Sequence, residues 1–338
     1  MKMFEPHPLL RNPHAQTFAA TFWPRRFPRL PRGTAREIET EAGTRIRGEC
    51  HWQARPRERP TLVLVHGLEG SSDSGYMLGL AERAFAAGWN AVRLNQRNCG
   101  GTESLTPTLY NSGLSGDYRA VLFELIDGDS LPEIFFAGYS MGGNLVLKMA
   151  GELAGAAPRQ LRGVAAVSPS LDLAACADAV ALPGNIVYQR RFVNSLKARM
   201  RRKAKLFPGK YDLSRMARVR TLREFDDVIT AAYCGFRDAA DYYVQSSALR
   251  VAGEIRVPAL VLTAQDDPFV PFASFSASAL AKNPYVTLIA PEHGGHCAFV
   301  SRYSGDARFW AEAMVMEFCR QLSAAAFGRE EIEEQHRT

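Results

Sequence analysis

Short apolar runs alternate with helical patterns along most of this chain, and this alternation limits the folds that it can adopt. The runs are rich in Val, Leu, Ile and Phe, and we interpret them as buried strands. Apolar strands that are separated by helices form a parallel sheet covered on both faces, with right-handed connections. The expected strands lie at 61–67, 90–96, 133–140, 162–170, 257–267 and 285–295. The sequence therefore predicts an α/β fold with a mostly parallel, doubly wound sheet.

The segments around these runs indicate the remaining elements. Residues 36–52 predict two short strands around a turn at Ala42–Gly43. The first thirty residues are rich in Pro and Arg, and we interpret them as an irregular arm. One further helix is expected between the last two strands. The other expected helices lie at 76–88, 116–126, 143–154 and 306–327.

A long interruption separates the fourth and fifth parallel strands. About 90 residues lie between Val167 and Ala259, whereas an αβ connection usually takes roughly two to six. Apolar residues recur near helical spacing inside it, so we predict an inserted helical cap at 170–245. Ligands of open α/β sheets bind beyond the carboxyl ends of the strands, where such an insertion could cover them. The other predicted parts are an arm at 1–35, an α/β core at 36–169 and 246–328, and a tail at 329–338.

Composition narrows the class of protein further. Of the 338 residues, 46% are hydrophobic and 22% are charged, which is ordinary for a globular chain with a sizeable core. The net charge is +6, but thirteen Lys and Arg with a single acid lie between Arg190 and Arg223. Because one segment carries this charge, we expect no nucleic-acid partner. No signal peptide or bilayer-spanning run is evident, and none of the six cysteines forms C-x-x-C, so we expect a cytoplasmic protein with reduced thiols.

A serine crowded by glycines follows the third of these strands. Residues 138–144 read Gly-Tyr-Ser-Met-Gly-Gly-Asn, and a helical pattern comes next. A chain that passes from strand to helix within a few residues bends sharply, which exposes the hydroxyl of Ser140 and leaves no room for side chains two residues away. A glycine-rich turn with a capping serine also matches the five-residue pattern. The strand before it and the helix after it favour a nucleophile.

A serine hydroxyl is a weak nucleophile and needs a base. His293 and His296 both follow the last expected strand. We favour His296, because Gly294–Gly295 directly before it would let the loop bend back across the strand ends. His66 lies at the end of the first parallel strand, and we expect it to have a structural role.

The base in turn needs an acid that orients it. Asp266 and Asp267 end the fifth parallel strand. We assign Asp267 to orient His296 and interpret Asp266 as a turn or cap residue, with Asp172 as a weaker alternative. The chain order Ser140, Asp267, His296 is typical of α/β-hydrolases.

Two backbone N–H groups are expected to bind the oxyanion. One belongs to Met141, the residue after the serine. The other belongs to Leu68, in the loop after the first parallel strand, where Gly67 permits the turn that aims it.

Beyond these residues, the chain resembles the α/β-hydrolase superfamily and, within it, the branch of YheT-like and embryogenesis-associated hydrolases. The resemblance implies a serine hydrolase acting on esters, with Ser140, Asp267 and His296 at the triad positions. Members are linked to carboxylesterase, lipase and phospholipase-type activities. Asn98 replaces the commoner glycine of one motif, which could alter the shape of the pocket. The matching segments are 12–17, 66–71, 94–103, 138–144, 225–227, 266–271 and 294–299.

These observations predict a carboxylic-ester hydrolase that forms an acyl-enzyme on Ser140 and needs no metal or organic cofactor. The alternatives are an acyltransferase on the same residues, a lipase or phospholipid-directed lipase at membrane surfaces, and a non-catalytic binding protein with this fold. The expected partner is a small-molecule or lipid ester. The basic helix expected near 190–207 suits peripheral contact with anionic lipid, although a merely solvated basic helix has the same pattern. The oligomeric state stays open.

Overall fold

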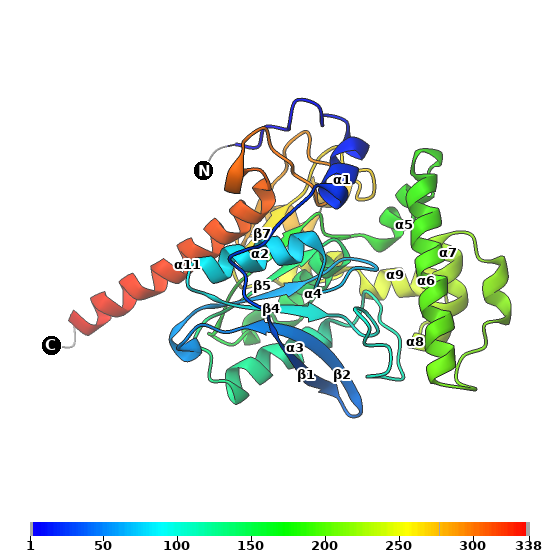
Figure 1. Cartoon of the computed structure of the whole chain (residues 1–338), viewed down its shortest axis with the longest axis horizontal. Helices are drawn as coiled ribbons and strands as arrows, with labels where there is room; N and C mark the ends of the chain where they lie inside the picture. The colour runs from blue at the N-terminus through cyan, green and yellow to red at the C-terminus, as the bar shows by residue number, and fades with distance from the viewer. Residues whose placement is uncertain (1–2, 277, 336–338) are drawn as a thin grey trace.

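A central sheet organises the part of the chain that this computed structural model describes, residues 3–276 and 278–335 (Figure 1). Within it the strands are β1 (Thr34–Glu41), β2 (Thr44–His51), β3 (Thr61–Val65), β4 (Asn90–Asn95), β5 (Ile134–Tyr139), β6 (Leu161–Val167), β7 (Ala259–Leu262) and β8 (Val286–Ile289). Their order is β1-β2-β4-β3-β5-β6-β7-β8. β2 pairs antiparallel with β1 and β4, and all the pairs from β4 to β8 are parallel. The predicted mostly parallel sheet is therefore confirmed.

Helices cover both faces of the sheet, as Figure 1 shows. They are α2 (Gly75–Ala86), α3 (Ser115–Phe123), α4 (Met141–Leu153) and α11 (Trp310–Gln335). The central strand β3 is buried along its whole length. Leu62 and Leu64 pack with α2 and α11, whereas Val63 and Val65 pack with α3 and α4. Because successive side chains alternate between faces, an apolar strand such as β3 requires cover on both sides.

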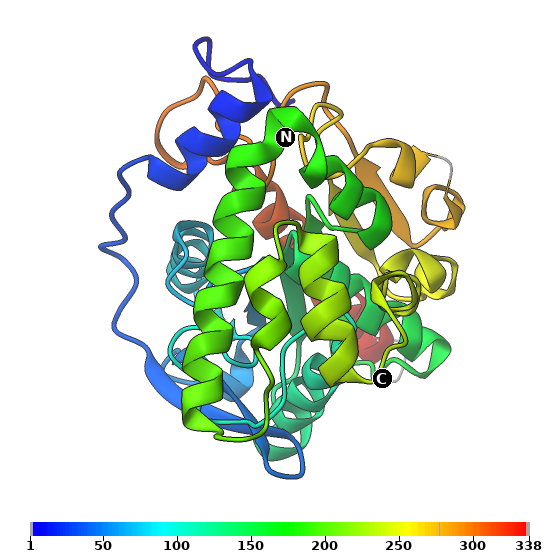
Figure 2. The same ribbon diagram turned by 90° about the vertical axis from the view of Figure 1, so that its right-hand side faces the viewer.

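A group of helices is inserted between β6 and β7, within the residues for which the cap was predicted. We refer to these helices as the cap, and Figures 1 and 2 show them as a layer at one end of the sheet. They are α5 (Leu173–Ala181), α6 (Ile186–Leu206), α7 (Leu222–Phe225), α8 (Ala232–Cys234) and α9 (Ala239–Ser246). Val193, Leu196 and Met200 of α6 form a buried cluster with Phe225 and Ile229. This cluster gives the cap an apolar interior of its own.

The prediction of an irregular N-terminal arm was wrong at residues 13–22, which form helix α1 (Pro13–Phe22). The side chain of Asn12 accepts hydrogen bonds from the backbone N–H groups of His14 and Ala15, and Pro13 occupies the first helical position. Both features stabilise a helix start. The prediction relied on the abundance of Pro and Arg in this segment and overlooked the capping signal at which the helix begins.

Short helical turns complete the described structure. Helix α10 (Ala273–Ser276) lies between β7 and β8. Helix α11 runs to Gln335 and so includes the first residues of the predicted tail, whereas 336–338 lie outside the described residues. No helix among the described residues is both long and apolar enough to cross a membrane. The remaining turns are η1 (Pro56–Glu58), η2 (Glu124–Gly128), η3 (Ala154–Ala156), η4 (Pro183–Asn185), η5 (Ser214–Arg218), η6 (Asp226–Ala231), η7 (Ala248–Arg250), η8 (Ala252–Glu254), η9 (Ala279–Lys282) and η10 (Gly305–Ala307).

Candidate active site

Ser140 occupies a strained bend between β5 and α4. Its φ of 54° and ψ of −120° are unusual for a residue with a side chain. A Cβ atom on Gly138 would lie 2.1 Å from the carbonyl oxygen of Gly142, and one on Gly142 would lie 2.3 Å from that of Val65. Only glycine fits at either position. The sharp bend predicted from the glycine spacing is therefore present, and it projects Ser140 at the carboxyl edge of the sheet.

His296 reaches Ser140 from the loop that follows β8. Its Nε2 lies 2.9 Å from Ser140 Oγ, and its Nδ1 lies 2.9 Å from Asp267 Oδ2. Asp267 follows β7, and its side chain is fully buried. Its Oδ1 also accepts hydrogen bonds from the backbone N–H groups of Phe269 and Val270. With Nδ1–H donating to this fixed carboxylate, Nε2 is free to accept the serine proton.

Two opposing influences act on the pKa of His296. Burial lowers the pKa, because it disfavours the charged imidazolium form, but the Asp267 carboxylate, together with Cys297, outweighs burial and holds the pKa well above its ordinary value. The ring of Phe269 packs 4.8 Å from the imidazole ring and limits the access of water. The surroundings of His296 therefore stabilise its charged imidazolium form.

The alternative acid and base residues lie elsewhere. His293 is 42% exposed, and its Nδ1 lies 3.3 Å from Asp266 Oδ2. Asp266 also accepts a hydrogen bond from the N–H of Gly295, so it shapes the loop before His296. Asp172 caps α5 by accepting from the N–H of Ala175. These contacts match a turn or cap role for both carboxylates.

The loop after β3 closes the site on another side. Leu68 and Met141 both line a cavity at Ser140, and Met141 begins α4, where an N–H has no acceptor within its own helix. His66 is completely buried. Its Nδ1 lies 2.7 Å from the Gly67 carbonyl oxygen, and its Nε2 accepts from the N–H of Gln96. Burial lowers the pKa of His66 to about 4, so this ring is neutral and fixes the loop.

A largely apolar cavity leads from Ser140 between the cap and the sheet. We call it the cap chamber. Asn98 also lines it, with a φ of 65° and a buried Oδ1 that has no hydrogen-bond partner among the described residues. Asn98, which stands where the motif more commonly has glycine, thus forms part of the chamber wall. Apolar residues of the wall include Leu68, Leu173, Phe192, Leu196, Met200 and Phe225.

A second cavity approaches the same serine from the N-terminal side. We call it the α1 cleft, because Phe18, Thr21 and Arg25 of the α1 segment form one wall and α6 forms the other. It shares Ser140 and His296 with the cap chamber. Within the described part of the chain, no group of three or more His, Cys, Asp or Glu side chains is placed to hold a metal ion.

Residues of α1 support the His296 loop, and the sequence analysis missed them. Thr17 Oγ1 accepts a hydrogen bond from the backbone N–H of His296. The side-chain amide of Gln16 is completely buried and bonds both the N–H and the carbonyl oxygen of Val300. The helix-start signal at Asn12 could have revealed α1, but nothing local in the sequence shows which loop it contacts.

The fold and the arrangement at Ser140 together define an α/β-hydrolase. The profile of the family described as the alpha/beta hydrolase fold matches residues 60–303, and the chain belongs to this family. Within it, the chain belongs to the branch that includes the putative esterase YheT of Escherichia coli. The two chains are 34% identical over 267 residues, which cover 78% of each.

Two further comparisons agree with this placement. The embryogenesis-associated protein EMB8 of Picea glauca is 28% identical over 335 residues, which cover 93% of this chain and 71% of that protein. Among solved structures, an esterase of Pyrococcus furiosus superposes with a TM-score of 0.59 at 16% identity, and covers 96% of this chain and 98% of its own. At that identity the likeness shows a shared fold.

Proposed function

We propose that this protein is a carboxylic-ester hydrolase that works through an acyl-enzyme on Ser140. The observation that carries the proposal is the continuous hydrogen-bonded row from Ser140 Oγ through His296 to Asp267, at a strained bend that faces the cap chamber. The name of the related putative esterase supports the same reaction class.

In the proposed reaction, Ser140 Oγ attacks the ester carbonyl while His296 Nε2 takes the hydroxyl proton. Asp267 stabilises the imidazolium that forms. The N–H groups of Leu68 and Met141 bind the oxyanion, and each such donor typically contributes about 3 kcal/mol to transition-state stabilisation. His296 then returns the proton to the leaving alcohol. Water attacks the acyl-enzyme by the same route, which releases the acid and restores Ser140.

The cap chamber suits the acyl part of the ester. Phe192, Leu196, Met200 and Lys203 of α6 all line it. At about 1.5 Å per helical residue, the distance from the first to the last of these is roughly 16 Å. An extended apolar acyl chain fits along such a wall, and its burial favours binding by about 0.8 kcal/mol per methylene. We therefore expect activity to increase from acetyl esters to medium-chain esters.

Hydrolysis of p-nitrophenyl esters from acetyl to palmitoyl tests the proposal. Ser140→Ala removes the attacking oxygen, and we expect kcat to fall by on the order of 10⁵–10⁶-fold. His293→Gln is the matched control, because His293 contacts Asp266 and not Ser140; it should keep activity within about twofold. Undiminished hydrolysis by a folded Ser140→Ala protein would show that Ser140 is not the nucleophile.

An acyltransferase on the same residues is the second candidate. The α1 cleft favours it, because a second cavity that reaches Ser140 and His296 can hold an acceptor alcohol beside the acyl-enzyme. Product analysis with glycerol added separates the two reactions. Acyl transfer predicts new ester formed at the expense of free acid, whereas hydrolysis predicts free acid alone.

A further inference from the structure

Exposed apolar side chains lie on α1 and around the start of α6, the two helices that contribute walls to the α1 cleft. Phe18 and Phe22 lie on α1, and Phe22 is 68% exposed. Leu182 directly follows α5, and Ile186 and Val187 begin α6, where Val187 is 61% exposed. We call these five residues the docking face. Exposed large apolar side chains on neighbouring elements mark a candidate site of interaction.

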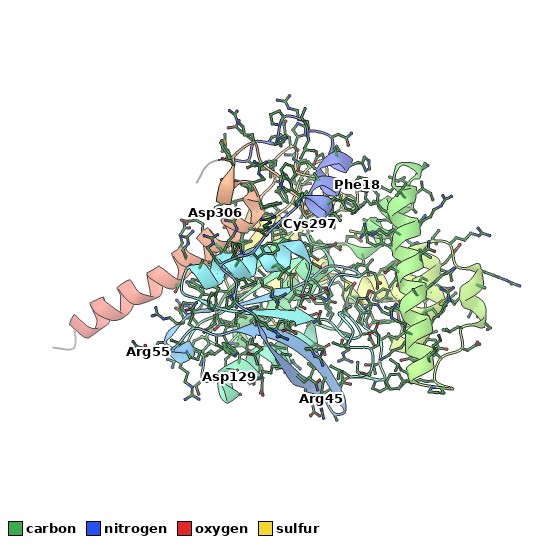
Figure 3. The ribbon with its side chains drawn as sticks, viewed as in Figure 1. Phe18, Arg45, Arg55, Asp129, Cys297 and Asp306 are labelled. Carbon is green, nitrogen blue, oxygen red and sulfur yellow. The ribbon has the colours of Figure 1, made fainter. Side chains whose placement is uncertain are left out.

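Tyr188, which follows Val187 in α6, links the two helices that carry the docking face. The ring of Phe18 stacks on that of Tyr188 in α6 at 5.0 Å, and on that of Phe22 at 6.3 Å. Figure 3 shows Phe18 on α1 beside the nearer end of α6, and Figure 2 shows these two helices side by side.

One row of side chains on α6 links the docking face to the active site. Val187, Arg191 and Ser195 are spaced four residues apart, so they follow one another along one side of the helix. Arg191 and Ser195 line the α1 cleft. Val187 precedes them in this row toward the start of α6, so the docking face lies beside the cleft that leads to Ser140.

Unpaired arginines flank the docking face. Arg11 and Arg26 lie on either side of α1, and Arg190 and Arg191 lie near the start of α6. All four are exposed, and none forms an ion pair with a described side chain. Positive charge beside exposed aromatic and aliphatic groups complements an anionic lipid surface, where the apolar groups enter the interface and the arginines meet the headgroups.

Farther along α6, the basic residues are used inside the protein. Arg199 pairs with Glu69, Arg202 pairs with Glu103, and the buried Lys203 donates to the carbonyl oxygen of Glu103. Some of the basic residues that were expected to form an exposed face along 190–207 thus contact the core instead. Arg190 and Arg191, at the start of the helix, stay free of ion pairs beside several exposed apolar residues, whereas the exposed Arg201 and Lys205 near its end have only Leu206 as an exposed large hydrophobic neighbour in the helix.

We propose that the docking face binds an anionic lipid surface, with the mouth of the α1 cleft directed toward the membrane. An ester dissolved in the lipid then reaches Ser140 along the cleft without crossing bulk water. This route rests on the proposed function, but adsorption to the surface does not require catalysis. The two can therefore be tested apart.

Cosedimentation of the full chain with vesicles tests the proposal. The vesicles contain phosphatidylcholine alone or phosphatidylcholine with phosphatidylglycerol. We expect the wild type to bind the anionic vesicles at least tenfold more tightly, because each arginine near such a surface contributes about 1 kcal/mol. Arg190→Gln with Arg191→Gln should weaken that binding by roughly thirtyfold, which corresponds to about 1 kcal/mol for each arginine. Phe22→Ser with Val187→Ser should weaken it by about tenfold through lost apolar burial.

The matched control is Arg215→Gln with Arg218→Gln, which removes two exposed arginines of η5 outside the docking face. It should bind as the wild type does. Equal affinity for both vesicles, no binding at all, or an equal loss in the control would overturn the proposal; absence of binding would point to a protein partner for this face. Urea unfolding of each variant checks that it is folded.

Ser140→Ala separates this proposal from the proposed function. It should bind anionic vesicles as tightly as the wild type, because Ser140 lies inside the cleft. Vesicle binding by a wild-type protein without esterase activity would refute only the proposed function. Esterase activity without a preference for anionic vesicles would refute only the lipid surface.

Discussion

Among single residues, Asp267 has the largest influence on the candidate base. Its carboxylate opposes the effect of burial and keeps the pKa of His296 well above the ordinary value. Hydrolysis needs neutral His296, so kcat/KM should rise with pH as this imidazolium loses its proton. In Asp267→Asn, burial acts without the strongest influence that opposes it, and the pKa of His296 should fall.

Two changes are therefore expected together in Asp267→Asn. The acidic limb of kcat/KM should move to lower pH, and kcat should fall by roughly 10³–10⁴-fold because the imidazole loses its orientation. Asp266→Asn is the control, since Asp266 shapes the neighbouring loop without touching the ring of His296. It should leave the acidic limb in place. An unmoved limb in Asp267→Asn would contradict the assignment.

Between elements, a buried contact ties the cap helix α6 to the loop that carries Leu68. Glu69 follows Leu68 directly and has a strained φ of 58°. Its carboxylate accepts from Tyr110 Oη at 2.6 Å and from the hydroxyl of Ser195, and it pairs with Arg199 at 3.0 Å. Both charged side chains are only 8% exposed. We infer that α6 positions the N–H of Leu68 through Glu69.

A double-mutant cycle distinguishes positioning from stability. Glu69→Gln leaves Arg199 buried without its partner, which should cost about 3–5 kcal/mol of unfolding free energy. Adding Arg199→Met removes the orphaned charge and should restore much of that stability. If Glu69 positions the oxyanion loop, kcat stays reduced by roughly tenfold or more in the double variant, with KM nearly unchanged.

Arg202→Gln provides the matched control for this cycle. It removes another ion pair of α6, but its partner Glu103 lies outside the Leu68 loop. Its kcat should equal that of the wild type. Recovery of kcat together with stability in the double variant would mean that the pair only holds the cap in place.

The elements differ in how far local sequence determines them. The parallel strands and the bend at Ser140 follow from apolar runs and glycine spacing, which are local, and the sequence predicted both. Helix α1 also begins at a local signal, Asn12–Pro13, but composition concealed it. The contacts from Thr17 to His296 and from Glu69 to Arg199 join residues more than a hundred positions apart. No periodic pattern encodes such pairs, so only the folded chain shows them.

At the scale of the whole molecule, one ionisable side chain in the cap should affect the unfolding free energy of the protein. Asp226 begins η6 and lines the cap chamber. Burial raises the pKa of its carboxyl to about 6, and hydrogen bonds from Thr230 and Tyr243 oppose this only in part. The folded chain therefore binds a proton at this site over a pH range in which the unfolded chain has lost it.

This difference in bound protons sets the direction in which the unfolding free energy changes with pH. Between the ordinary carboxyl pKa and about 6, the folded state binds more protons, so the unfolding free energy should fall as the pH rises. The side chain at this position in Asp226→Asn cannot ionise, so the variant does not lose unfolding free energy in this way as the pH rises. Relative to wild type, its unfolding free energy should increase by about 2 kcal/mol between roughly pH 4 and pH 8, as measured by urea unfolding. Parallel stability curves for the two proteins would show that Asp226 is already charged in the folded cap at low pH.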